Sequence, residues 1–495
     1  MVKHKQTVIA AVFLSLFYFA TRLINLTLLP IFTDEAIYIR WSQIALQDPQ
    51  HRFISLYDGK QPLFVWLNML TLKLPVDPLV AGRLVSVAAG LASLIGIIAL
   101  AWRLFGQKTA FFTGLLYVIS PFFLFYDRLA LYDSLTNTFM IWALLLQVIL
   151  VQTLRLDAAL LLGFAIGGGL LTKSSAGFAI YLLPVSLLLF DWRRSDRWRR
   201  MGVWVGLSLV AVFIAFLFEV IMKLSPYQHM VGLKTARFIV PFQEFFVADA
   251  WARFHGNLGG LTNWLIAYFT WPWLIGVGVT LLTTLKLHWR KTLLLFGWFI
   301  GPFLILAAFG LILYPRFILF MTFPLLIILA FGLGQLEIRS IRSIVVYLLL
   351  AAYAAYFSFQ IIFNPVFAPL PGADRGQFID DWPAGYGINE IVAFLRQETQ
   401  NKKVFVATEG TFGLTPYALE IYLQGNPNIT IQGFWPINDH PEEIFSKVGQ
   451  FDEVYILFKD SQNPPERFPD RDIELVSQYR KGKGNIFMKL YRLKR

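Results

Sequence analysis

The chain has 495 residues, of which 57% are hydrophobic and only 15% are charged, and its mean hydropathy is +0.58. This balance excludes a soluble globular domain and indicates a polytopic membrane protein. The formal net charge of +12 favours contact with anionic membrane lipids, and no basic-aromatic motif suggests a nucleic-acid partner. Cysteine is absent, so disulfides and thiolate metal sites are excluded.

Long apolar runs recur from the N-terminus to about residue 363. Each is long enough to cross a hydrocarbon layer of about 30 Å as a helix. The first run has a basic start, which is typical of a cleaved signal peptide, but we expect it to be retained because no clear cleavage site follows. We predict about eleven spanning helices, at residues 7–30, 79–102, 109–126, 133–153, 158–173, 175–190, 201–222, 262–285, 292–313, 317–336 and 344–363.

The loops between these spans alternate in charge. Basic residues gather in every second loop, including the run 191–200 and the pair Arg339 and Arg342. By the positive-inside rule these loops are cytoplasmic. The opposite side then receives loops 31–78, 127–132, 223–261 and 314–316 and the tail 364–495. We therefore predict a multi-pass protein of the cell (plasma or inner) membrane with an extracytoplasmic tail.

The tail differs in composition from the rest of the chain. A linker rich in Pro, Gly and Asp at 364–387 follows the membrane domain, residues 1–363. Helical and strand patterns then alternate through residues 388–495. They predict helices at 388–400, 416–423 and 441–448, strands at 403–408, 429–432 and 453–458, and two antiparallel strands within 473–493. A small extracytoplasmic α/β domain is the expected fold.

Two acidic residues, Asp34 and Glu35, stand where the first apolar run gives way to an outer loop. Charges at a membrane boundary are costly unless they are solvated, paired or used chemically. Thr33 precedes the pair, and acids are favoured in the first turn of a helix, so a simple helix start is one explanation. A chemical role for the carboxylates is the other.

Cations also occur in the outer loops, against the positive-inside bias. Any of them can extend along the membrane surface or pair with a carboxylate, and we expect this of Arg52, Lys73, Lys223 and Lys234. Others suit an anionic lipid phosphate, because charged donors bind its oxygens strongly. The predicted phosphate ligands are Lys60, Arg83, Arg128, Lys173 and Arg316.

Several short motifs occur in a fixed order between about residues 20 and 335. They are Arg22, Pro30-x-x-x-Asp34-Glu35-Ala36, Gly59-Lys60-Gln61-Pro62-Leu63, Gly82-Arg83-Leu84, Asp127-Arg128 with Asp133-Ser134, Leu171-Thr172-Lys173 and Tyr314-Pro315-Arg316-Phe317, with a fainter likeness in Trp382-Pro383-Ala384-Gly385. This series resembles the polyprenyl-phosphate-sugar glycosyltransferases of the GT-C fold, near the protein O-mannosyltransferases and the bacterial aminoarabinose transferases that modify lipid A. The family's Lys-Pro-Pro-Leu is here Lys60-Gln61-Pro62-Leu63, and its Thr-Lys-Gly-Pro is Thr172-Lys173-Ser174-Ser175.

The resemblance implies a chemistry for these residues. A sugar on a polyprenyl phosphate has a good leaving group, so the enzyme must activate an acceptor hydroxyl and stabilise the departing phosphate. Asp34 matches the family's loop carboxylate and is the expected general base, with Glu35 as its partner, a metal ligand or a helix-start acid. Asp133 is expected to orient Arg128 or Lys60, although it could also bind a divalent ion or cap the following span.

A divalent metal ion is the one cofactor that the outer residues suggest. Its candidate ligands are Glu35, His229 and His255, whose spacing fits no metal motif. The long loop 223–261 either covers the lipid of the donor or lies in the membrane interface without a gating role.

We therefore predict a GT-C-like inverting glycosyltransferase. Its partners would be a polyprenyl-phosphate sugar donor, membrane lipids, and a lipid, glycan or protein acceptor outside the cytoplasm, with no nucleic acid. The alternative is a transporter or flippase of polyprenyl-linked sugars. Such a protein should show inverted repeats with helices broken at mid-membrane, and the sequence shows no such halves.

Overall fold

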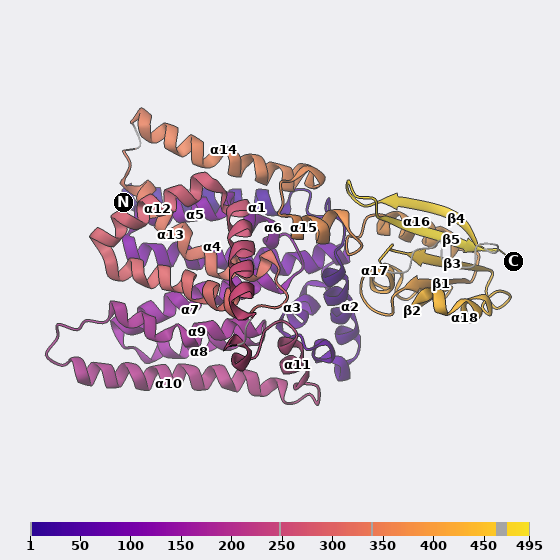
Figure 1. Cartoon of the computed structure of the whole chain (residues 1–495), viewed down its shortest axis with the longest axis horizontal. Helices are drawn as coiled ribbons and strands as arrows, with labels where there is room; N and C mark the ends of the chain where they lie inside the picture. The colour runs from indigo at the N-terminus through magenta and orange to yellow at the C-terminus, as the bar shows by residue number, and fades with distance from the viewer. Residues whose placement is uncertain (1, 247–248, 338–339, 462–472, 495) are drawn as a thin grey trace. The chain divides into compact units, whose positions relative to one another are not determined.

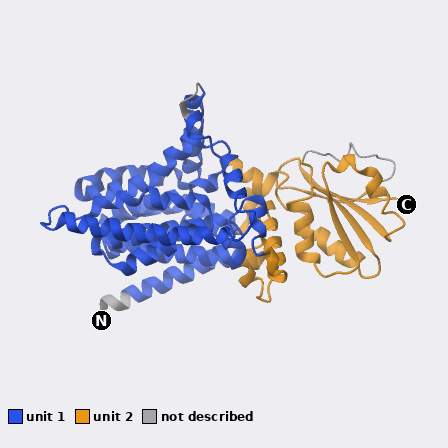
Figure 2. Cartoon of the chain, turned by 90° about the horizontal axis from the view of Figure 1, so that it is seen from below, with its two compact units in different colours: residues 1–24, 52–67, 83–362 blue, residues 25–51, 68–82, 363–495 orange. Residues whose placement is uncertain are grey.

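A computed structural model describes residues 2–246, 249–337, 340–461 and 473–494. Arg339 and part of loop 223–261 therefore lie outside the described residues. The chain forms two compact units, one of residues 1–24, 52–67 and 83–362 and the other of residues 25–51, 68–82 and 363–495 (Figure 2). The segment 31–78 thus contributes to both units, whereas we predicted it entirely within the membrane domain.

The first unit is a bundle of apolar helices (Figure 1). Among the described residues, six helices are long and apolar enough to cross a membrane, and the pair α5–α6, bent by 61°, would make a seventh. This confirms a polytopic helical membrane protein, while the number eleven stays a prediction. The main helices are α1 (Val2–Leu23), α4 (Pro78–Phe105), α5 (Gln107–Ile119), α6 (Pro121–Asp127), α7 (Tyr132–Thr153), α8 (Leu156–Leu170), α10 (Arg197–Met222), α12 (Ala250–Phe309), α13 (Leu319–Gln335) and α14 (Ile341–Phe363).

Three predicted spans differ from separate, regular spanning helices. Residues 175–190 form no single α-helix but the sequence η3 (Ser174–Gly177), α9 (Phe178–Tyr181) and η4 (Leu183–Leu189). Pro184 lacks the amide proton that a continuous helix needs there. The predicted spans 262–285 and 292–313 join in α12, which has non-helical backbone at Thr270 and His288.

Glycines let α8 approach its neighbours closely. A Cβ on Gly167 would lie 2.6 Å from the ring of Phe218 on α10, and one on Gly168 would lie 2.5 Å from the ring of Phe139 on α7. Larger residues would separate the helices, as expected for tight packing in a membrane. The packing fixes the end of α8, from which Thr172 and Lys173 continue.

The second unit contains a five-stranded sheet in the order β2-β1-β3-β5-β4. The strand β1 is parallel to both β2 and β3, while β5 is antiparallel to β3 and β4. Every residue of β1 is buried, as expected for a central strand. The strands are β1 (Val404–Glu409), β2 (Ile429–Phe434), β3 (Glu453–Phe458), β4 (Ile473–Arg480) and β5 (Phe487–Leu493).

Three helices accompany the sheet: α16 (Ile388–Glu398), α17 (Leu414–Leu423) and α18 (Pro441–Phe445). Side chains from β1, β3 and β2 form a buried core with Ile444 of α18, for example Phe405, Ile456 and Phe434. The predicted α/β domain is therefore confirmed. The helix α2 (Thr33–Gln47), from the first outer segment, belongs to the same unit.

Candidate active site

Two loops that carry predicted phosphate ligands are bonded together in the first unit. The amide of Leu63 donates to the carbonyl of Leu171 at 3.0 Å. Close by, Gln61 Nε2 donates to Ser174 Oγ at 2.6 Å. The backbone around Lys60 therefore lies beside the backbone around Lys173, as a shared phosphate site requires. Gln61 and Ser174 are also the positions where each motif departs from its family pattern, and they contact each other.

The Lys60 loop is shaped by the residues just before it. Gly59 has φ +66°, and a Cβ at that position would lie 2.4 Å from the carbonyl oxygen of Met230. The helix α11 (Met230–Ala236) therefore packs directly on this turn. Lys234 of α11 also pairs with Asp58 at 2.7 Å, so Lys234 belongs to the paired cations, as predicted. The loop 223–261 thus braces the Lys60 segment.

Lys173 is held by a carboxylate. Its Nζ lies 2.7 Å from Oδ1 of Asp133, in the first turn of α7, and the Asp133 side chain is only 6% exposed. We predicted Arg128 or Lys60 as the partner of Asp133; the ion pair is instead with Lys173. The same Nζ lies 4.6 Å from the centre of the Phe317 ring. The segment that carries Arg316, η6 (Pro315–Ile318), therefore adjoins this pair.

Arg128 is engaged with the end of α1. Its Nη1 donates to the carbonyls of Thr21, Arg22 and Ile24, each at 2.9 Å. The last carbonyls of a helix lack partners within it and attract a cation, so this guanidinium stabilises the C-terminus of α1. That use differs from the predicted contact with phosphate. Arg83, which is fully buried in α4, lies near enough to interact electrostatically with Arg128.

A buried ion pair lies next to this group. Arg22 Nη2 and Asp127 Oδ2 are 3.3 Å apart, and both residues are fully buried. Ser134 Oγ donates to Asp127 at 2.9 Å, which satisfies a further carboxylate oxygen. Removing one member would leave the other charge buried and uncompensated. In the sequence both residues are parts of the motifs, and the signal for their pairing is that opposite charges interrupt two apolar runs.

Asp34 and Glu35 lie in the first turn of α2, in the second unit. Glu35 is fully buried, and its Oε2 accepts the backbone N–H of Phe32 at 2.9 Å. Glu35 is therefore a helix-start acid, one of its predicted roles. Asp34 is half-buried at the next-to-first helical position.

The start of α2 is fixed by the segment Trp382-Pro383-Ala384-Gly385. The backbone N–H and the hydroxyl of Thr33 donate to the carbonyl of Pro383 at 3.1 and 3.0 Å. Phe32 forms an antiparallel bridge with Ala384. A Cβ on Gly385 would lie 2.2 Å from the carbonyl oxygen of Ile31. The faint C-terminal motif therefore has a physical role, because it holds the helix that carries Asp34.

The rest of α2 is held by α17. Arg40 Nε lies 2.6 Å from Glu420 Oε2, and Gln43 Nε2 donates to the carbonyl of Ile421 at 3.2 Å. These contacts show that the sheet unit supports α2.

A buried lysine fastens the Trp382 segment to the sheet. Lys481 is fully buried, and its Nζ donates to the carbonyls of Trp382 and Lys459 at 2.9 and 3.1 Å. Burial, with a smaller contribution from the charge of Lys459, lowers the pKa of Lys481 to about 7. The Lys459 ammonium also lies 4.6 Å from the centre of the Trp382 ring. Nothing in the local sequence pattern indicated this cluster.

The candidate metal ligands do not assemble into a site. Within the part of the chain that the structure describes, no three His, Cys, Asp or Glu side chains are placed to hold a metal ion. His229 Nδ1 lies 2.9 Å from the carbonyl of Pro226, and the His255 ring packs against Trp251 with centroids 4.4 Å apart. Glu35 is used at its own helix start. These three residues thus have local structural roles.

Comparison with known proteins gives a family match and a fold. Residues 59–218, which include the Lys60, Arg83, Arg128, Asp133 and Lys173 motifs, match the family of dolichyl-phosphate-mannose-protein mannosyltransferases. The solved structure of ArnT from Cupriavidus metallidurans bound to undecaprenyl phosphate is similar over 99% of this chain and 98% of that chain, with 16% identity and a TM-score of 0.63. This chain is a membrane protein of the GT-C glycosyltransferase fold.

Two further GT-C structures share the architecture. The archaeal oligosaccharyltransferase AglB from Archaeoglobus fulgidus, in complex with an inhibitory peptide and a dolichol-phosphate, has 12% identity and a TM-score of 0.52, covering 92% of this chain and 69% of that chain. The arabinofuranosyltransferase AftD from Mycobacteria has 16% identity and a TM-score of 0.51, covering 99% and 42%. No curated protein sequence matches. At these identities the likeness shows the GT-C fold.

Proposed function

We propose that this GT-C protein transfers a single sugar from a polyprenyl phosphate to an acceptor hydroxyl outside the cytoplasm. The acceptor is a lipid, a glycan or a protein. The observation that carries the proposal is the cluster of Lys173, Asp133 and the Lys60 loop, because it concentrates cations within the segment that matches the mannosyltransferase family. The similar ArnT structure holds undecaprenyl phosphate, a lipid phosphate of the proposed donor class.

In the proposed reaction, the cations stabilise the departing polyprenyl phosphate. As the bond between the anomeric carbon and the phosphate oxygen breaks, negative charge grows on the polyprenyl phosphate. Lys173, held by Asp133, and Lys60 are assigned to stabilise that charge, and Arg316 to add a planar donor. Preorganised charges are effective because they need no rearrangement as the reaction proceeds.

Asp34 is assigned as the general base. Its carboxylate takes the proton from the acceptor hydroxyl while the oxygen attacks the anomeric carbon, and polyprenyl phosphate leaves from the opposite face. One displacement inverts the anomeric centre. The position of Asp34 in the first turn of α2, whose start is fixed by the Trp382 segment, supports this role, since a general base must be held in a defined place.

The test uses the full chain in liposomes with radiolabelled polyprenyl-phosphate sugars and an envelope lipid and glycan extract as the source of acceptors. Asp34→Asn should lower transfer by about 10²- to 10⁴-fold, the usual contribution of a general base. Asp249→Asn changes another exposed outer acid and should transfer at the parental rate. An inverted anomeric configuration in the product, measured by NMR, is expected.

Three results would count against the proposal. Parental transfer by Asp34→Asn would remove Asp34 as the base. Retention of configuration would exclude the single displacement. If the donor is not consumed while the lipid-linked sugar crosses the vesicle membrane, the chain is a transporter or flippase.

A further inference from the structure

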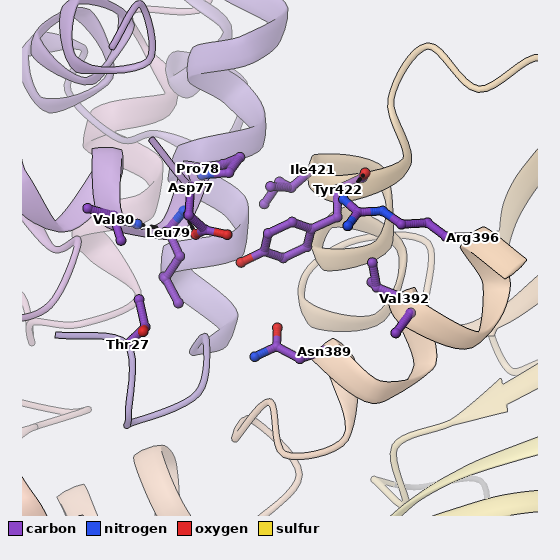
Figure 3. Close-up of a pocket in the computed structure, with 11 residues that line it drawn as sticks. Thr27, Asp77, Pro78, Leu79, Val80, Asn389, Val392, Arg396, Ile421 and Tyr422 are labelled. Carbon is purple, nitrogen blue, oxygen red and sulfur yellow. Dashed lines mark hydrogen bonds between the residues drawn. The ribbon is translucent and has the colours of Figure 1, made fainter. Parts of the chain in front are cut away.

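A pocket of about 570 Å³ lies within the second unit, apart from the groups assigned above. All of its lining residues belong to this unit. They come from the segment after α1, from the residues around the start of α4, and from α16 and α17 (Figure 3). The volume is within the range of small-molecule sites.

The polar groups of the pocket offer both donors and acceptors. Asp77 Oδ1 accepts the N–H groups of Leu79 and Val80 at 2.8 and 3.4 Å, which fixes the carboxylate at the start of α4. Arg396 Nη2 donates to the Tyr422 carbonyl at 3.0 Å, which steadies the guanidinium on the other wall. The Asn389 amide, which carries a donor and an acceptor, points into the space between them (Figure 3).

One carboxylate and one guanidinium balance the charge of this lining, so it does not select a strongly charged ligand. Tyr422 projects from α17 toward Asp77 and presents an aromatic ring to the pocket (Figure 3). Val392 and Ile421 add apolar surface. A flat apolar wall combined with amide, carboxylate and guanidinium groups suits a ligand with an apolar ring face and several hydroxyls at its edge. A sugar ring has this character.

The pocket is also coupled to the helix of the assigned base. Ile421 and Tyr422 line it from α17, and the same helix holds α2 through Glu420 with Arg40 and through the Ile421 carbonyl with Gln43. A ligand in the pocket therefore contacts the element that supports α2. Leu79 and Val80, on the opposite side, begin α4, one of the helices long enough to span a membrane.

We propose that this pocket binds a neutral saccharide of the acceptor, an inference that rests on the proposed function. The saccharide is either part of a free glycan or the headgroup of a glycolipid, since both present the same hydroxylated ring. Tyr422 supplies the stacking surface, and Asn389, Asp77 and Arg396 bind hydroxyls.

The test measures saturation transfer by NMR from the full chain in nanodiscs, which avoids competition from maltoside detergents. Free chitobiose and maltotriose probe a glycan, and nanodiscs with galactosyl diacylglycerol probe a headgroup. Transfer to sugar ring protons is expected from at least one probe. Tyr422→Ala should weaken it about tenfold, the effect of losing about 1.4 kcal/mol at a binding anchor. Asn389→Leu changes an exposed residue with little risk to folding and should also weaken it.

Gln397→Ala is the matched control, because Gln397 is an exposed residue of α16 outside the pocket lining and should leave binding unchanged. Binding of the free sugars identifies a glycan as the source, whereas binding of the galactolipid alone identifies a headgroup. Absence of binding to every probe, or binding that Tyr422→Ala and Asn389→Leu leave intact, overturns the inference. Release of polyprenyl phosphate from the donor, measured in parallel, separates these results from failure of the proposed function itself.

Discussion

The two units of the chain hold their charged groups by different physical means. In the first unit, Lys173 is fixed by a side chain that is distant in sequence, the carboxylate of Asp133. In the second unit, Asp34 is fixed through its helix, which is held by backbone contacts to the Trp382 segment and by side-chain contacts to α17. The position of Lys173 therefore depends on one ion pair, and the position of the proposed base depends on how the whole of α2 is held. Mutations should affect the two units differently.

Among the contacts that hold the proposed site residues, the largest effect is expected where Lys173 loses its charge. Lys173→Met keeps the length of the side chain but leaves Asp133, 6% exposed, without its cation. Donor cleavage should fall by about 10²- to 10³-fold, as when one electrostatic stabiliser of a transition state is removed. Release of polyprenyl phosphate from labelled donor measures this. Lys223→Met, at an exposed lysine directly after α10, is the control and should cleave donor normally. A parental rate for Lys173→Met would remove this lysine from the site.

A shift of the start of α2 should lower the rate of transfer slightly less than the loss of the Lys173 charge. In Gly385→Ala the new methyl group would meet the Ile31 carbonyl at 2.2 Å, so the backbone before α2 must shift. Misplacement of a reacting group by about 1 Å can cost about 10²-fold in rate. We expect kcat for transfer to fall by that order while KM for the donor stays near the parental value. A lower kcat with an unchanged KM distinguishes a displaced Asp34 from a damaged donor site.

Gly372→Ala provides the matched control for this substitution. Gly372 belongs to the same unit, and a Cβ there would have no neighbour within 4 Å. Its kinetics should be parental. Equal losses in the two variants would show that α2 is not positioned by the Gly385 contact.

The buried Lys481, which holds the Trp382 segment that supports α2, predicts a pH dependence of stability in the second unit. The pKa of Lys481 is about 7 in the folded chain, against about 10.4 for an unperturbed lysine. Between these values the unfolded state binds more protons, so stability should rise as pH increases from about 7 to 10.4. Hydrogen exchange of β5 at pH 7 and 9, corrected for intrinsic rates, measures the change. The charged groups around Lys481 are Lys459, Glu409, Asp460 and Asp381.

Lys481→Met should reduce this rise, because it removes the buried titrating amine. Lys402→Met is the control, since Lys402 lies in the same unit in surface ion pairs with Glu398 and Glu453. It should keep the parental pH dependence of β5. An unchanged profile in Lys481→Met would assign the dependence to another group.

Local patterns in the sequence predicted the elements of the fold better than the contacts of the site. The alternation of helical and strand patterns in the tail predicted the strand Glu453–Phe458 as the structure has it. The partner of Asp133 was not predictable, because Lys173 lies 40 residues away and depends on how α7 packs beside α8. Arg128 illustrates the same limit. A sequence shows that a cation is present, but not that helix-end carbonyls occupy one of its nitrogens.

The smallest effect is expected for the hydrogen bond between Gln61 and Ser174, two positions at which the motifs differ from the family pattern. Gln61→Ala and Ser174→Ala each remove the 2.6 Å hydrogen bond that joins the Lys60 and Lys173 loops. A neutral bond contributes about 1 kcal/mol, so donor affinity should weaken about fivefold in either variant. The double variant should bind no more weakly than the single ones, since all three lose the same bond. Ser175→Ala is the control, because Ser175 Oγ has no hydrogen-bond partner in the described part of the chain. Additive losses in the double variant would mean that Gln61 and Ser174 act on the donor separately. The two loops would then be aligned by the hydrogen bond between Leu63 and Leu171 instead.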